Sequence, residues 1–336
     1  IAFTVFNVKQ LSAQHAADKI HREAVVVDAH AHQLILGNDK PDNQLNLKML
    51  EEGAVDAVGL YFAYYPLENT SLVEQVRNDM GQLQTQIAMA NHPVDVASGS
   101  GQVLEIVEKG NIAVVPGVEY FYGVFQNNTG TVDSLYGLGI RSITLMDNEY
   151  DRLSLKGHEE HTSAALSDFG KGVVDRMNRL GMLIDISHLD DQMQLAVIDY
   201  SDSPVIASHS PVRGVHNTDR NIPDEILKKM AAKNGAIMIT FNSGDLAGVK
   251  NGRTDIDRLI DHIMHAIQIA GIDHVGIGSD FNGAGLRSPA GLENASGFPG
   301  ITAALLNRGL SDDDIGKVLG LNYLNLLESV EEFAHE

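Results

Sequence analysis

The sequence predicts a (β/α)8 barrel of the TIM type, and three observations point to this fold. Short β-branched apolar runs recur eight times, helical stretches lie between them, and metal-binding or acid–base residues stand where several runs end. An open, doubly wound sheet fits the same alternation, but the barrel also predicts reactive residues at the carboxyl ends of several strands. The expected strands are 24–29, 54–61, 112–118, 139–146, 181–187, 204–208, 235–241 and 274–279.

Helical patterns fill the intervals between these runs, and several of them end in glycine, as helix carboxyl termini commonly do. Examples are 173–181, 225–235 and 258–271. We read the long stretch 67–110 as an elaborated, mostly helical βα connection. Residues 311–333 begin with a capping signal at Ser311 and read as a helix that closes the barrel. The expectation is therefore one domain over residues 1–336.

Composition excludes several classes of function. The chain has 336 residues, no cysteine and a net charge of −21. This charge argues against nucleic acid and anionic membranes as partners, and the lack of cysteine excludes disulfides, thiolate metal sites and a cysteine nucleophile. No apolar stretch is long enough to span a membrane, and no signal segment precedes the first strand. Whether a leader was removed, and whether the protein is exported or cytoplasmic, stays open.

The first apolar run ends in the motif VVVDAHAH over residues 25–32. In an extended strand the side-chain period is two, so Asp28, His30 and His32 are expected on one side. The two imidazoles are candidate metal ligands. Asp28 reads more simply as a residue that orients a ligand.

Four other runs end in residues of the same kind. A lone histidine at a strand end is more often packed than ligating, but six such residues at the ends of five strands are a different matter. Buried together without a cation, they would leave desolvated polar groups without partners. Imidazole and carboxylate without thiolate favour zinc, with manganese, iron or cobalt as alternatives, and two ions fit if one carboxylate bridges them. The six residues are His30, His32, Glu119, His188, His209 and Asp280.

The order of these motifs resembles the renal (membrane) dipeptidase family, within the metal-dependent amidohydrolase superfamily. The resemblance runs from about residue 16 to 330. Its most specific parts are MNRLGMLIDISH (177–188), PVIASHSPVRGVHNTDRNIPDE (204–225) and HVGIGSDFNG (274–283).

The resemblance implies a role for each ligand candidate. His30 and His32 are expected to bind the first zinc ion, and Glu119 is expected to bridge both ions. His188 and His209 are expected to bind the second ion.

Two further roles follow from the same resemblance. Arg220 is expected to hold the terminal carboxylate of the substrate through its planar fork of donors. Its plainer interpretation is a surface ion pair with Asp219 or Asp224. Asp280 is expected to shuttle the proton of the bridging water, first as a base and then as an acid.

Two positions depart from the family pattern. At residue 32 the family usually has Asp, and this chain has His. After the fourth strand the family usually has a histidine that donates to the developing oxyanion, and this chain has Asp147. Losing such a donor typically costs a factor of about 10²–10³ in rate. Asn148 is a candidate replacement donor, as are the loop residues His158 and His161, although we expect that loop to be solvated.

We expect a metal-dependent hydrolase that cleaves a dipeptide or similar small amide by attack of a metal-bridging hydroxide. Its partner is then a small peptide, and a homodimer stays open. The alternative is a dipeptidase-like protein with weak or altered activity on a non-standard, peptide-derived substrate, because of Asp147. In that case Asp147 is expected to bind a cationic group of the substrate. An amidohydrolase acting on lactones or acylated amino acids would share the same site.

Overall fold

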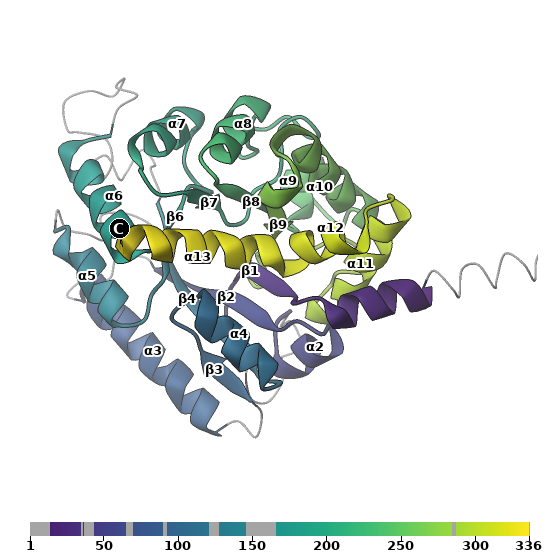
Figure 1. Cartoon of the computed structure of the whole chain (residues 1–336), viewed down its shortest axis with the longest axis horizontal. Helices are drawn as coiled ribbons and strands as arrows, with labels where there is room; N and C mark the ends of the chain where they lie inside the picture. The colour runs from purple at the N-terminus through teal and green to yellow at the C-terminus, as the bar shows by residue number, and fades with distance from the viewer. Residues whose placement is uncertain are drawn as a thin grey trace, which may run out of the picture.

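The computed structural model describes residues 14–34, 36, 44–64, 70–89, 93–120, 128–145, 166–283 and 287–335. Within these ranges the expected barrel is confirmed, since eight parallel strands follow one another around a sheet in chain order (Figure 1). The strands are β1 Val27–Ala31, β2 Ala57–Tyr64, β4 Ile112–Tyr120, β5 Ser142–Thr144, β6 Leu183–Asp185, β7 Val205–Ala207, β8 Ala236–Ile239 and β9 Val275–Ile277.

The barrel closes just beyond the ends of β9 and β1. The backbone N–H of Asp280 donates to the carbonyl of His30 at 2.8 Å, and His32 N–H donates to the carbonyl of Phe281 at 2.8 Å. An isolated parallel bridge joins Ala31 to Phe281 at the same place. Closure therefore brings the first and last predicted site residues side by side.

The connection between β2 and β4 holds one strand that the sequence pattern did not predict. It contains α3 (Leu72–Met89), β3 (Val94–Val96) and α4 (Ser100–Glu108), so its mostly helical character is as expected. β3 pairs in parallel with the first residues of β4, whereas β5 pairs with the last ones. Three residues with an aspartate in the middle give too short a run for recognition as a strand.

Helices surround the strands, as in other barrels of this type (Figure 1). A helix over 14–23 precedes β1. The others are α2 Leu47–Glu52, α5 Gly130–Gly137, α6 Asp168–Leu180, α7 Asp191–Tyr200, α8 Asp224–Ala232, α9 Ser243–Ala247, α10 Ile256–Ala270 and α11 Phe298–Asn307. No described helix is both long and apolar enough to cross a membrane.

The expected closing helix has two segments. Ser311 caps α12 (Asp312–Gly316), its hydroxyl accepting from the N–H of Asp314 at 3.1 Å, as predicted. A π-type turn over Lys317–Leu321 then leads into α13 (Asn322–His335). At Gly320 in this turn a Cβ would lie 2.2 Å from the carbonyl oxygen of Val25, so only glycine allows the helix to approach the chain before β1 so closely.

α13 crosses the amino-terminal end of the barrel (Figure 1). Its buried residues Tyr323, Leu324 and Leu327 belong to one hydrophobic cluster with apolar residues of β1, β2, β4, β6, β7 and β8. This end of the barrel is therefore apolar and covered, and the site must lie at the other end.

Several predicted strands are shorter or shifted in the structure. The first strand runs over Val27–Ala31 rather than 24–29, and the last over Val275–Ile277 rather than 274–279. Apolar residues such as Val26 are fully buried but precede the strand, so an apolar run overestimates the length of the strand.

Candidate metal centre

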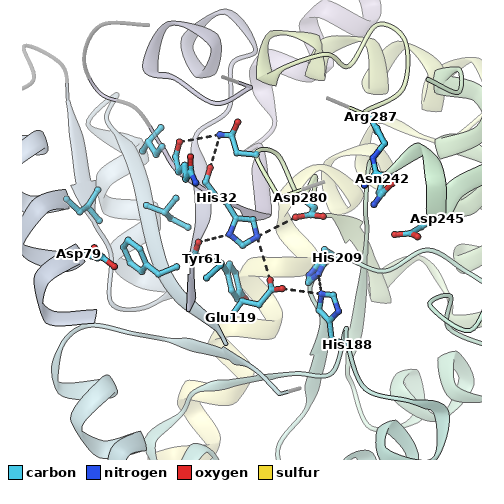
Figure 2. A pocket seen from close by; sticks show the side chains of 18 of the residues that line it. His32, Tyr61, Asp79, Glu119, His188, His209, Asn242, Asp245, Asp280 and Arg287 are labelled. Atoms are coloured by element: carbon cyan, nitrogen blue, oxygen red, sulfur yellow. Dashed lines mark hydrogen bonds and ion pairs between the residues drawn. The ribbon is translucent and has the colours of Figure 1, made fainter. Parts of the chain in front are cut away.

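Five predicted ligands converge at the carboxyl-terminal end of the strands, and His32, Glu119, His188 and His209 are labelled in Figure 2. Glu119 lies at their centre and is 5% exposed. Its Oε2 is 3.1 Å from Nε2 of His30 and 3.6 Å from Nε2 of His32. Its Oε1 is 3.2 Å from Nε2 of His188. Each oxygen of one carboxylate thus faces a different set of imidazoles.

The imidazoles also face one another. Nε2 of His188 lies 2.8 Å from Nε2 of His209, and Nε2 of His30 lies 3.2 Å from Nε2 of His32. A neutral imidazole has one donor and one acceptor nitrogen, so at least one nitrogen of each facing pair must direct a lone pair into this region. Two groups of these residues could each hold a metal ion. One is His30, Glu119 and His209, and the other is His30, His32 and Asp280.

The electrostatics of this cluster fit a cation. Burial works to raise the pKa of Glu119, but the neighbouring His188 and His30 hold it well below its ordinary value. Burial lowers the pKa of His209 well below its ordinary value, which keeps this ring neutral and able to ligate. Oε2 of Glu119 is buried and has no hydrogen-bond partner among the described residues. Buried polar atoms normally have a partner, so this atom fits a bound divalent ion.

Asp280 lies at the edge of the cluster, with Oδ1 3.4 Å from Nε2 of His32. Burial works to lower the pKa of His32, but Asp280 and Glu119 outweigh it and raise that pKa. Asp280 has a positive φ of 60°, an uncommon conformation for a residue other than glycine. A carboxylate held this way, open to the cavity, can exchange a proton with a nearby water molecule.

Asp28 does not join the two imidazoles, which corrects the expectation of one shared side. The register against β2 shifts between Asp28 and Ala31, so strict alternation fails there. The Asp28 carboxylate instead accepts from the N–H of Ser279 at 2.8 Å and from its hydroxyl at 2.6 Å. Burial raises the pKa of Asp28 to about 7. Its position supports the backbone that carries Asp280.

Arg220 lies at the rim of the same cavity and makes neither of the ion pairs considered from the sequence. Its Nη1 donates to the carbonyl of Ser187 at 2.6 Å and to the hydroxyl of Ser210 at 2.9 Å. Its Nη2 donates to the carbonyl of His209 at 2.7 Å. Arg220 therefore ties together the chain beside two predicted ligands. The Nε–H and one Nη2 hydrogen have no partner among the described residues.

A cavity of about 990 Å³ lies over the cluster. Residues of α3, including Asp79, line one wall, and Asn242, Asp245 and Arg287 line the opposite wall (Figure 2). Burial raises the pKa of Asp245, and its carboxylate makes no hydrogen bond with another described residue. The volume is at the upper end for small-molecule sites, so a dipeptide-sized ligand fits.

The residues that support the ligands were not predicted from the sequence. Asp185, Ser187 and Ser208 form a buried hydrogen-bonded group beneath them. The signal was present, because a serine precedes both His188 and His209. The walls of the cavity were missed as well, since Asp245 belongs to no motif. Asp147, Asn148, His158 and His161 lie outside the described residues.

Comparison with known proteins points to one family. A family model described as membrane dipeptidase (peptidase family M19) matches residues 14–336. The dipeptidase verJ of Clonostachys rogersoniana is 35% identical over 303 residues, covering 85% of this chain and 76% of that protein. The dipeptidase ataJ of Aspergillus terreus is 30% identical over 327 residues, covering 88% and 79%.

Solved structures show the same fold. The probable dipeptidase PvdM of Pseudomonas aeruginosa superimposes with a TM-score of 0.84 at 20% identity, covering 96% of this chain and 99% of that one. A metallopeptidase of Rhodobacter sphaeroides, liganded with a phosphinate mimic of the dipeptide L-Ala-D-Ala, gives 0.76 at 22% identity, covering 91% and 99%. With the barrel, the cluster and the family match in agreement, this chain belongs to the membrane dipeptidase family, peptidase family M19.

Proposed function

We propose that this protein hydrolyses dipeptides that have a free terminal carboxylate, using two zinc ions held by His30, His32, Glu119, His188 and His209. The observation that supports this most is the position of Glu119. Its two oxygens face different imidazoles, and one of them is buried without a hydrogen-bond partner. A carboxylate that bridges two ions would use both oxygens in this way.

The ions, when bound, supply Lewis-acid chemistry that activates a water molecule and polarises the scissile carbonyl. We assign the proton transfers to Asp280, whose carboxylate borders the cluster and the cavity. It accepts the proton of the attacking water and returns it to the leaving amine.

Arg220 binds the terminal carboxylate of the substrate in this proposal. Its remaining donors, Nε–H and one Nη2 hydrogen, are available, and the guanidinium lines the cavity. The backbone carbonyls that it holds keep it in place, so little conformational entropy is lost when a substrate binds.

We further infer that residues 1–336 form one domain.

The test is reconstitution of metal-stripped protein with zinc, followed by metal analysis and assay on L,L and L,D dipeptides. We expect two ions per chain and hydrolysis that depends on them. Clearly less than one ion per chain would overturn the metal centre. One ion per chain would retain the site and contradict the bridging role of Glu119.

The alternative function, weak or altered activity on a peptide-derived substrate, rests on Asp147 in the sequence. The same assay separates the two, with Asp147→His as the variant. If the histidine variant is faster on simple dipeptides, Asp147 has altered the activity, because the resemblance implies a donor to the developing charge at this position and the variant restores one. If wild type is fast and the variant slower, the alternative is wrong.

A further inference from the structure

One serine hydroxyl contacts two of the predicted metal ligands. Ser208 follows β7 and is fully buried. Its Oγ lies 2.8 Å from Nδ1 of His30 and 2.9 Å from Nδ1 of His209. The two rings lie against each other, with centroids 3.8 Å apart. By the proposed assignment they serve different ions, His30 the first and His209 the second.

The direction of these hydrogen bonds follows from Asp185, which lies beneath Ser208 at the end of β6. The Asp185 carboxylate accepts from the N–H and the hydroxyl of Ser208. It also accepts from the N–H and hydroxyl of Ser187, and from the hydroxyl of Thr144 at 2.6 Å. All five of these groups are donors, so Asp185 acts only as an acceptor.

A hydroxyl has one hydrogen and two acceptor lone pairs. The hydrogen of Ser208 goes to Asp185, which leaves both lone pairs for the rings. Each ring must then donate its Nδ1–H, and each is left with an unprotonated Nε2. Those Nε2 atoms are the ones that face Glu119 and His188 respectively.

We propose that Ser208, held by Asp185, is a positioning residue that fixes the tautomer and orientation of one ligand in each of the two ion sites. Ligating histidines generally donate their second ring nitrogen to a carboxylate, carbonyl or water. Here one hydroxyl serves two such rings, so the two ion sites share one support. His32 is independent of it, because its Nδ1 donates to the carbonyl of Tyr61 at 2.9 Å. The inference rests on the proposed metal centre.

The test variant is Ser208→Ala, which removes the acceptor of both Nδ1–H groups. The matched control is Ser201→Ala, outside the site. Ser201 is fully buried, and its hydroxyl donates to the side chain of Asn178 and to the carbonyl of Ser203, with no contact to a histidine. Both variants remove one buried, hydrogen-bonded hydroxyl, so loss of stability alone should affect them alike.

The first measurement is zinc affinity of the metal-stripped protein, titrated in competition with a chromophoric chelator. We expect Ser208→Ala to weaken both zinc dissociation constants by about 10–100-fold, the usual effect of removing such a support. Ser201→Ala should leave both near the wild-type values. The inference would be overturned if Ser208→Ala weakened only one of the two constants or neither of them. It would also be overturned if the control variant weakened both constants as much as Ser208→Ala does. Failure of wild type to bind zinc would instead overturn the proposed metal centre.

The second measurement needs no Ser208 variant and no metal. Histidine labelled with ¹⁵N reports the tautomer of each ring by NMR, and the rings can be assigned by His→Gln substitution. We expect both His30 and His209 of the metal-free wild type to carry the proton on Nδ1. An Nε2–H tautomer at either ring would contradict the role of Ser208, whether or not Ser208→Ala folds.

Discussion

The two ends of the barrel interior are built by the same strands and have opposite chemistry. Towards the amino-terminal end, β1, β4, β6 and β7 contribute Val27, Val115, Leu183 and Ile206, which pack with α13. Within one residue of their carboxyl ends, the same four strands contribute His30, Glu119, Asp185 and Ser208. A few residues along each strand therefore separate an apolar layer from a polar one that is just as buried.

This difference shows how the barrel divides stability from chemistry. Burial of apolar side chains against α13 is favourable without any ligand. Burial of imidazoles and carboxylates is costly unless each finds a partner, and Oε2 of Glu119 has none among the described residues. Substitutions at the polar end should mainly affect metal binding and turnover, and those at the apolar end should mainly affect unfolding.

The largest effect is expected at the polar end, from Asp280→Asn. An amide keeps the shape of the side chain but does not accept a proton from water at neutral pH. We expect turnover of a dipeptide to fall by about 10²–10⁴-fold, the usual contribution of an acid–base group, with metal content nearly unchanged. Steady-state assay and metal analysis check this, with the exposed Asp202→Asn as control. Near-native turnover would assign the proton transfers to another group.

At the apolar end we expect Leu327→Ala to destabilise the protein without changing its chemistry. Leu327 is fully buried in the cluster that α13 forms with the strands. Truncation should lower the free energy of unfolding by about 2–5 kcal/mol, measured by urea denaturation. Leu321→Ala is the matched control, because this leucine precedes α13 and is 40% exposed. Loss of zinc affinity in the folded Leu327→Ala protein would break the division between the two ends.

A third prediction concerns acid, away from both layers. His262 of α10 accepts from the N–H of Val212 through Nδ1 and donates through Nε2 to the carbonyl of Leu246, so both nitrogens are satisfied only in the neutral ring. Burial lowers the pKa of His262 to about 4. The unfolded chain binds a proton on this ring more readily than the folded chain does. The stabilisation that the neutral His262 ring gives to the folded state is therefore complete above about pH 6.5 and is lost as the pH falls towards 4. The loss should be about 3 kcal/mol.

Urea denaturation of metal-free wild type and His262→Gln between pH 7 and 4.5 measures this contribution. We expect the gap in unfolding free energy between the two proteins to narrow as the pH falls. A constant gap would contradict the prediction. The comparison also separates acid loss of general stability from acid release of metal at the polar end.

The sequence was informative where structure depends on local pattern. Apolar runs located the eight strands, and the position of each polar residue after a run located the site, because parallel strands of a barrel end at one face. The support of the ligands depends instead on pairing between distant residues. Ser208 and His30 are 178 positions apart, and Thr144 and Asp185 are 41 apart. The same holds for Asp245, which reaches the cavity through the position of α9. No spacing within a motif specifies these contacts.

The smallest expected effect is at Arg220, which borders the polar end without belonging to the ligand cluster. Arg220→Lys keeps the charge and loses the planar fork of donors. We expect kcat/KM for a dipeptide with a free terminal carboxylate to fall about tenfold (~1.4 kcal/mol) more than for its amidated analogue.

The matched control is Arg213→Lys, because Arg213 forms a two-point ion pair with Asp191, at 2.6 and 2.8 Å, and does not line the cavity. Equal losses on both substrates would mean that Arg220 acts only through the carbonyls of Ser187 and His209, as a support of the ligand-bearing chain. A selective loss would mean that the same guanidinium also binds substrate, and would extend the polar end of the barrel from the ion sites to the peptide.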